Sequence, residues 1–278
     1  MRNNEDRTGA KKKSPSKSAA FAAAAPLEFV RPTTVVALPS EGKFYPEDHP
    51  LHGQDSIEIR QMTTAEEDIL TNRTLLKKGT AINKFLERLL VDSGVHPDDL
   101  LVSDKNAVLI QARIDGYGEE YTTQVTCPAC SHSQKESFNL NEAIETVGGE
   151  QKLVEETGAG TFASTLDNGW VVEFRSLTGK DEQDIVKASE NAKRANRPDT
   201  AIQNQLNAMI VSISGHSDKP TIRKAVEYMT GKQSRQLRAA YKDAVANVEI
   251  RGTITCRECA TTSEMEVPLT ADFFWAKP

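Results

Sequence analysis

The chain has 278 residues, of which 38% are hydrophobic and 27% are charged, a balance typical of a globular protein. No apolar run approaches the roughly 20 residues that a bilayer-spanning helix needs, so a transmembrane protein is not expected. The length fits one large domain or two ordinary ones.

Charge is unevenly distributed along the chain. Residues 1–34 hold seven Lys or Arg against three acidic residues, a net of +4, and because the chain total is −6 the remainder carries −10. We predict that residues 1–34 form a disordered basic tail rich in Ala, Lys and Ser. The acidic remainder argues against binding to a phosphate backbone, which requires clustered Lys and Arg. Contact of the tail with nucleic acid or with an acidic partner remains an alternative.

The tail also has a superficial likeness to an export signal, because basic residues precede the apolar stretch 19–25. That stretch is short and dominated by alanine, whereas export segments carry 7 to 15 strongly apolar residues. We therefore expect the chain to stay in a reducing cytoplasm, where close cysteine pairs bind metals or do redox chemistry.

Alternation of apolar and polar residues predicts half-buried strands, and apolar residues spaced by three and four predict helices. In the first half these patterns predict, in chain order, a strand at 35–38, a loop at 39–46, a strand at 56–60, a helix from 64, a helix at 75–90 interrupted by Gly79, a helix from 103 capped by Ser103, and strands at 121–126 and 134–140.

In the second half they predict a strand at 170–174, helices at 180–192, 202–213 and 234–245, the last capped by Ser234, and strands at 247–255 and 264–269. Glycines at 148, 149 and 158 favour a linker or crossover over residues 146–162. It would join a first half at 35–145 to a second half at 163–278. The aromatic residues Phe273, Phe274 and Trp275 would serve either as core cover or as anchors for a partner.

The two halves resemble each other in sequence. Ile57–Thr63 matches Val172–Thr178 without a gap, and Ala81-Ile82 later falls on Ala201-Ile202. The offset between matched positions grows from 115 to 120, and to 129 at the cysteines, as insertions in loops would produce. We therefore predict an internal duplication. The alternative is that two unrelated amphipathic segments share common residue types.

All four cysteines belong to two Cys-x-x-Cys pairs, one closing each half: Cys127, Cys130, Cys256 and Cys259. Two such turns, each between two strands, supply the four thiolates of a tetrahedral structural zinc site. The sequence thus predicts an α+β fold with two zinc-knuckle hairpins that share one zinc-ribbon-like Zn²⁺ site near a pseudo-twofold axis.

Other readings of the cysteines stay open. Iron is an alternative metal. A dithiol redox protein or holdase would need a cysteine with a lowered pKa, and two disulfides in an oxidised particle are a third option. His132 lies two residues after Cys130 and is a candidate substitute ligand, although an exposed turn histidine is the simpler interpretation.

No catalytic set stands out among the five histidines, and Gly116-Tyr117-Gly118 lacks the third glycine of a dinucleotide loop. We therefore expect no enzymatic activity and assign no catalytic or cofactor-binding residues. A zinc-ribbon regulator that binds nucleic acid through the basic tail is the alternative function.

Three segments carry a family resemblance: 38–46 (LPSEGKFYP), 59–70 (IRQMTTAEEDIL), and Tyr117-Gly118 with the first cysteine pair. They resemble the baseplate hub proteins of T-even-like contractile-tailed phages. The resemblance implies a structural or assembly protein whose partners are other hub, spike or tail-tube proteins. It also implies assembly in the host cytoplasm and a place in the virion tail baseplate.

Overall fold

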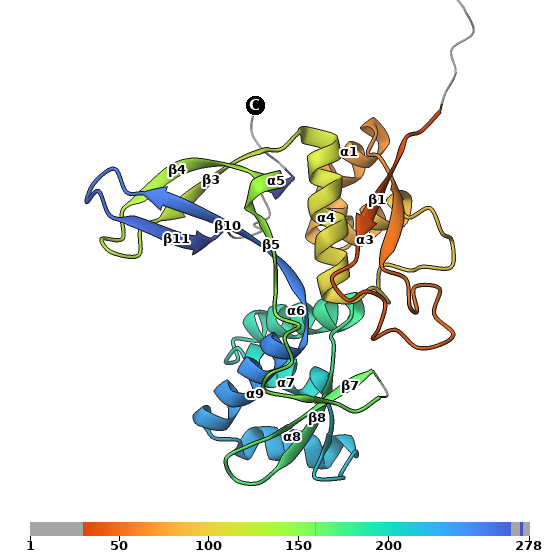
Figure 1. The fold of residues 1–278 in the computed structure, drawn as a ribbon, viewed down its shortest axis with the longest axis vertical. Coiled ribbons are helices and arrows are strands. Elements are labelled where there is room, and N and C mark those ends of the chain that lie inside the picture. The colour runs from red at the N-terminus through yellow and green to blue at the C-terminus, as the bar shows by residue number, and fades with distance from the viewer. Residues whose placement is uncertain (1–29, 159, 268–272, 275–278) are drawn as a thin grey trace, which may run out of the picture. The chain divides into compact units, whose positions relative to one another are not determined.

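The computed structural model describes residues 30–158, 160–267, 273 and 274. Contacts divide the chain into Met1–Arg31 and Pro32–Pro278, and every element named below belongs to the second unit. That unit has an α+β fold of helices and several small sheets (Figure 1). The predicted tail falls mostly on residues 1–29, outside the described residues, and the first strand already begins at Thr33.

The first elements of the chain are β1 (Thr33–Ala37), β2 (Ser56–Arg60), α1 (Thr64–Thr71), α2 (Arg73–Lys77), α3 (Ala81–Leu89), α4 (Val102–Tyr117), β3 (Glu120–Thr126), β4 (Ser133–Asn139), α5 (Leu140–Ala143) and β5 (Ile144–Val147). The later elements are β6 (Glu155–Glu156), β7 (Thr161–Thr165), β8 (Val171–Arg175), α6 (Gly179–Arg194), α7 (Ala201–Met209), β9 (Ile210–Ile213), α8 (Lys219–Tyr228), α9 (Gly231–Ala244), β10 (Asn247–Thr255) and β11 (Thr262–Glu266).

The sheets are built from antiparallel neighbours. β1 pairs with β2, and β7 pairs with β8 in a sheet of order β6-β7-β8-β9. The register places Thr33 opposite Arg60 in one pair and Thr161 opposite Arg175 in the other. β3 and β4 form a hairpin, and β10 pairs with β5 along its first part and with β11 along its second (Figure 1). β10 therefore joins β5, which follows the β3–β4 hairpin and α5 in the chain, to the β10–β11 hairpin in one sheet.

Helices α1 and α6 begin with the same chemistry. The Glu66 carboxylate accepts hydrogen bonds from the backbone N–H (3.0 Å) and hydroxyl (2.6 Å) of Thr63. The Asp181 carboxylate accepts the corresponding bonds, both 2.9 Å, from Thr178. These bonds satisfy donors that have no partner inside a helix, so both sequences start a helix at this point. The helix predicted to begin at residue 64 is confirmed, and Thr63 is its N-cap.

Three expectations for helices were wrong. Residues 202–213 are not one helix, because α7 ends at Met209 and Ile210–Ile213 pairs with β8 as β9. The run Ile-Val-Ser-Ile is rich in β-branched residues, which suit a strand. The caps predicted at Ser103 and Ser234 are also wrong, since the N-caps are Leu101 and Thr230. Thr230 starts its helix earlier because its side chain accepts a hydrogen bond from the N–H of Gln233.

Other boundaries differ from expectation in smaller ways. The pattern at 75–90 is two helices, α2 and α3, separated at Gly79, whose φ of 67° suits glycine. Residues 146–162 include the end of β5, all of β6 and the start of β7. Helix α8, capped by Asp218, was not predicted. The expected strand at 264–269 starts at Thr262 and ends at Glu266, while residues 268 and 269 lie outside the described residues.

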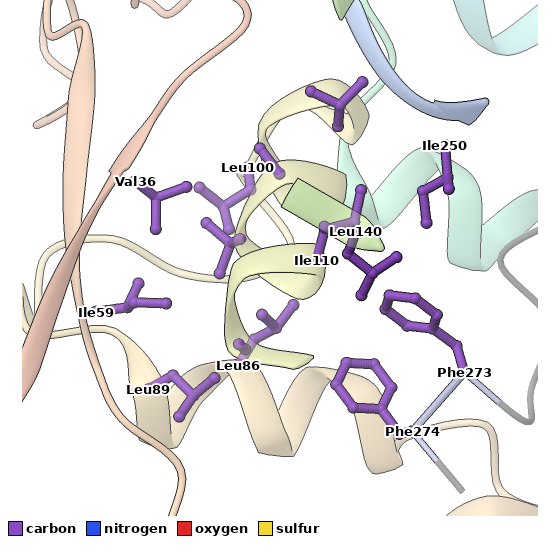
Figure 2. Close-up of a cluster of buried hydrophobic side chains, with 14 of the residues drawn as sticks. Val36, Ile59, Leu86, Leu89, Leu100, Ile110, Leu140, Ile250, Phe273 and Phe274 are labelled. Carbon is purple, nitrogen blue, oxygen red and sulfur yellow. The ribbon is translucent and has the colours of Figure 1, made fainter. Parts of the chain in front are cut away.

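Buried side chains form two clusters. One spans β1, β2, α3, α4 and the strands around the first cysteine pair, and Figure 2 shows part of it. The other spans β7 to α9. Phe44 is partly buried against both clusters. Phe273 and Phe274 lie in the first cluster as core cover, and Trp275 is outside the described residues.

Backbone hydrogen bonds connect the two clusters where helices α4 and α6 begin. The N–H of Val102 donates to the carbonyl of Leu177 (2.9 Å), and the N–H of Gly179 donates to that of Leu100 (2.8 Å). Lys105, only 7% exposed at its side chain, forms an ion pair with Glu182 at 2.6 Å. The first turns of α4 and α6 are thus tied directly to each other.

In the part of the chain that the structure describes, we find no helix with the length and apolar character needed to span a bilayer.

Candidate metal centre

The two cysteine pairs lie in turns of the same construction. In the β3–β4 hairpin the N–H of Cys127 donates to the carbonyl of His132 (2.8 Å), and the N–H of Ser131 donates to that of Cys127 (2.9 Å). In the β10–β11 hairpin Cys256 and Thr261 are bonded in the same way (3.0 Å), as are Ala260 and Cys256 (2.9 Å). Ser131 and Ala260 both have positive φ, 61° and 55°. Each turn therefore directs two thiols to one side of its hairpin.

All four cysteine sulfurs lie within 4.8 Å of one another. Two pairs are in contact across the hairpins: Cys127 Sγ with Cys259 Sγ at 3.8 Å, and Cys130 Sγ with Cys256 Sγ at 3.6 Å. The first cysteine of each turn is buried and the second is exposed. Residues separated by about 130 positions in the sequence thus form one compact donor set.

The donor set fits a tetrahedral metal ion of zinc's size. Zinc–sulfur bonds of about 2.3 Å require sulfurs about 3.8 Å apart at the corners of a tetrahedron. The two contacts of 3.6 and 3.8 Å match that edge. Four thiolates are also the ligand type that soft or borderline metals prefer. An ion held by all four sulfurs would have no open position for water, so the site suits a structural role.

The thiols perturb one another's ionisation. Hydrogen bonds with the side chain and backbone of Thr261 lower the pKa of Cys259 to about 6. At Cys130 a backbone hydrogen bond from His132 acts to lower the pKa, but hydrogen bonds with Cys259 and the other thiols, together with desolvation, raise it to about 12. Once Cys259 has lost its proton, its thiolate opposes the ionisation of Cys130, as expected for crowded like charges. A cation between the sulfurs would remove that opposition.

A buried amide connects the two hairpins beside the cysteines. Gln134, 5% exposed, donates to the carbonyl of Thr255 (3.0 Å) and accepts from the backbone N–H of Arg257 (2.8 Å). Its remaining N–H donates to Glu136 (2.7 Å). Arg257 in turn donates to the carbonyl of Lys135 (3.1 Å). Hydrogen bonds between protein groups therefore hold the two hairpins together without a metal ion, and they fix the relative positions of the two sulfur pairs.

The hairpins also pack closely at the end that lies away from the cysteine turns. A Cβ atom added to Gly252 in β10 would lie 2.3 Å from the ring of Phe138 in β4. Any larger residue at position 252 would displace that ring. Gly252 and Gln134 were missed in the sequence. The spacing of Gln134 and Phe138 on one face of β4 was the available signal, because alternate residues of a strand share a face.

The structure thus brings together all four cysteines singled out from the sequence. His132 is not part of the group whose donor atoms converge among the described residues. Its backbone carbonyl, rather than its ring, takes part in the turn by accepting the bond from Cys127. Zinc at this group stays a prediction, with iron as the alternative metal.

Comparison with known proteins identifies the family of the chain. A family model described as T4 bacteriophage base plate protein matches residues 31–275. Searches of curated proteins and of solved structures find no match. The family match covers both hairpins, both hydrophobic clusters and the segments that carried the resemblance in the sequence. The chain belongs to the T4 bacteriophage base plate protein family.

Proposed function

We propose that the chain is a structural or assembly component of the baseplate hub, formed by internal duplication and clasped by one structural zinc ion. Membership of the base plate family assigns it to the phage virion tail, with other tail or baseplate proteins as partners. Within that family, the hub role is favoured by the segments 38–46 and 59–70, whose sequences resemble hub proteins. A structural family also favours a role without enzymatic activity.

The duplication is supported by matched local structures. Both halves contain an antiparallel strand pair with Thr opposite Arg at one end, followed by a helix that opens with a Thr-carboxylate capping box. Helices α3 and α7 each have nine residues and start after a threonine. Both halves end in a hairpin with the same hydrogen-bonded cysteine turn. These matches follow the same order as the sequence matches, which independent segments would have no reason to do.

The zinc proposal depends on one observation: two thiols from each hairpin converge within 4.8 Å. Because each half supplies two ligands, a bound ion would join the two halves as well as the two hairpins. Each ligand pair is separated from the other by more than 120 residues. A crosslink across so long a loop removes much of the freedom of the unfolded chain, so it stabilises the fold strongly.

Metal analysis tests the zinc proposal. The chain is purified under reducing conditions and its metal content and thermal unfolding are measured, with Cys256→Ser as the variant and His132→Gln as the matched control. We expect one zinc per chain in the wild type and in His132→Gln, and loss of both zinc and stability in Cys256→Ser. A wild type that is fully stable without metal would contradict the clasp, and iron in its place would correct the choice of metal.

The hub role has a separate test. A tagged chain is recovered from infected cells at successive times, and the bound proteins are identified by mass spectrometry. Hub, central spike or tail-tube proteins are expected, bound first in the host cytoplasm. Association only with peripheral baseplate proteins would retain the family assignment and refute the hub position.

A further inference from the structure

The cysteine cluster has a second chemistry that needs no metal. Each sulfur contact across the hairpins joins an exposed thiol to a buried one: exposed Cys130 to Cys256 (2% exposed), and exposed Cys259 to Cys127 (1% exposed). A sulfur that solvent reaches can react first with an oxidant, and a neighbouring sulfur can then resolve the product. Each contact therefore contains both partners that disulfide formation requires.

We propose that the four cysteines are an oxidation site, at which a two-electron thiol oxidant forms two disulfides, Cys127–Cys259 and Cys130–Cys256, that lock the hairpins together. The sulfurs need to close by less than 2 Å from 3.8 and 3.6 Å to reach the bonded distance of about 2.05 Å. The proposal depends on the positions of the sulfurs and holds whether or not zinc binds.

The chemistry balances with a peroxide as oxidant. The exposed Cys259 thiol takes one oxygen from hydrogen peroxide, giving a sulfenic acid and one water. The Cys127 sulfur then attacks the oxidised sulfur, the S–S bond forms, and the hydroxyl leaves with the Cys127 proton as a second water. The two thiols lose two electrons in total and one peroxide is consumed. The pair Cys130 and Cys256 reacts in the same way with a second peroxide.

The pairing decides what oxidation does to the fold. Crossing disulfides connect residues 132 and 126 positions apart, whereas disulfides within a Cys-x-x-Cys turn would close only a tiny loop. Stabilisation by a crosslink grows with the length of chain that it encloses. Oxidation would thus replace a metal clasp with a covalent one. A protein of the virion tail would meet first a reducing environment, inside the host cell, and then an oxidising one, outside it.

The experiment begins with reduced full-length chain from which metal has been removed with a chelator. Two equivalents of hydrogen peroxide are added, and disulfides are located by mass spectrometry of non-reduced peptides. We expect Cys127–Cys259 and Cys130–Cys256 within single chains. Predominance of Cys127–Cys130 and Cys256–Cys259, disulfides between chains, or four thiols left intact would each overturn the proposal.

Two double variants provide a matched pair. Cys127→Ser with Cys259→Ser keeps one crossing pair and should form its disulfide at close to the wild-type rate. Cys127→Ser with Cys130→Ser leaves both remaining cysteines on one hairpin and should react about tenfold more slowly or slower. Equal rates in the two variants would contradict a preference for crossing bonds. Circular dichroism verifies that both fold, and the wild-type peptide map decides the pairing even if one does not.

Thermal unfolding in chelator measures the consequence. The oxidised wild type should melt about 5 °C or more above the reduced, metal-free protein. An unchanged or lower melting temperature would show that the disulfides do not lock the hairpins. The zinc content of the reduced chain is measured separately, so failure of the zinc proposal and failure of this one give different results.

Discussion

In both the first half (35–145) and the second half (163–278) of the chain, the third residue of a helix bonds to the segment between two paired strands. The carboxylate of this contact lies on the helix in the first half and on the connecting segment in the second half. Asp104, the third residue of α4, accepts hydrogen bonds from the hydroxyl (2.6 Å) and backbone N–H (3.1 Å) of Ser40. Gln233, the third residue of α9, donates to Asp167 (3.0 Å). Ser40 and Asp167 both lie in the segment that joins two paired strands, β1 to β2 and β7 to β8.

The environments of the two carboxylates differ. Asp104 is fully buried and also accepts a bond from the Tyr45 hydroxyl (2.8 Å), which itself accepts one from the N–H of Leu101 (3.1 Å). Asp167 is at the surface, where it also pairs with Lys232. A buried carboxylate is costly unless donors surround it. The first half therefore depends on its long loop, residues 38–55, to bring those donors to the helix, whereas the second half needs only a short turn.

Removing the helix residue should separate the halves most clearly. Asp104→Ala leaves the hydroxyls of Ser40 and Tyr45 and one backbone N–H without their buried acceptor, so we expect a loss of about 3 to 5 kcal/mol in the free energy of unfolding. Gln233→Ala should cost only about 1 kcal/mol, because water can reach Asp167. Urea unfolding of the two variants measures the difference. Equal losses would show that burial does not distinguish the two contacts.

A contact between the two hairpins, at Gly252, should have an intermediate effect. Gly252→Ala in β10 forces its Cβ against the Phe138 ring, so we expect a loss of about 1 to 3 kcal/mol in the free energy of unfolding. Gly231→Ala is the control, because its Cβ would have only Arg235 Nη1 nearby, at 3.9 Å. That change should stay within about 0.5 kcal/mol. If Gly252→Ala unfolds like the wild type, the hairpins do not pack through this contact.

Much of the local structure could be predicted because its signals lie in neighbouring residues. The strands at 56–60 and 247–255 are confirmed to the residue, since alternation marks both. Ile210–Ile213 failed because a short apolar run fits a helix end and a buried strand equally well, and its pairing partner, β8, lies some 40 residues away. Convergence of the four cysteines was predicted from the two similar Cys-x-x-Cys turns, and the structure confirms it.

Contacts between distant segments were not foreseeable in the same way. Nothing near Asp104 indicates that Ser40 and Tyr45, 64 and 59 residues earlier, supply its donors. Gln134 likewise looks like any polar strand residue until the second hairpin covers it. Patterns of three to four residues describe one element at a time, whereas these bonds depend on how two elements pack. The polar residues that fix the fold were therefore the ones missed.

The contributions of Asp104 and Asp181 to the stability of the fold should change with pH in opposite directions. Burial raises the pKa of Asp104, although hydrogen bonds from Ser40 and Tyr45 oppose the shift. Its charged form is thus disfavoured in the folded chain, and its contribution to stability falls as pH rises from about 4 through the raised pKa. At Asp181 burial alone would raise the pKa, but hydrogen bonds from Arg175 and Thr178 outweigh it and lower the pKa. Its contribution is lost as pH falls below about 4.

Two asparagine variants isolate these contributions. The difference in free energy of unfolding between wild type and Asp104→Asn should move against the wild type as pH rises from 4 to 7. The difference between wild type and Asp181→Asn should move against the wild type as pH falls from 5 to 3. The same sign of slope in both pairs would contradict the assigned shifts. Urea titrations at several pH values provide the measurement.

The smallest expected effect is one that should be the same in both halves. Beside each cysteine turn a pair of exposed hydroxyls faces across the hairpin, Thr126 with Ser133 at 3.1 Å and Thr255 with Thr262 at 3.2 Å. Cross-strand pairs of this kind contribute about 0.2 to 1 kcal/mol, so Thr126→Val and Thr255→Val should each cost no more than about 0.5 kcal/mol. Because the turns have the same hydrogen bonds, the two losses should agree within error of urea unfolding. A large loss in only one variant would show that the hairpins, despite their matching turns, support the cysteine cluster unequally.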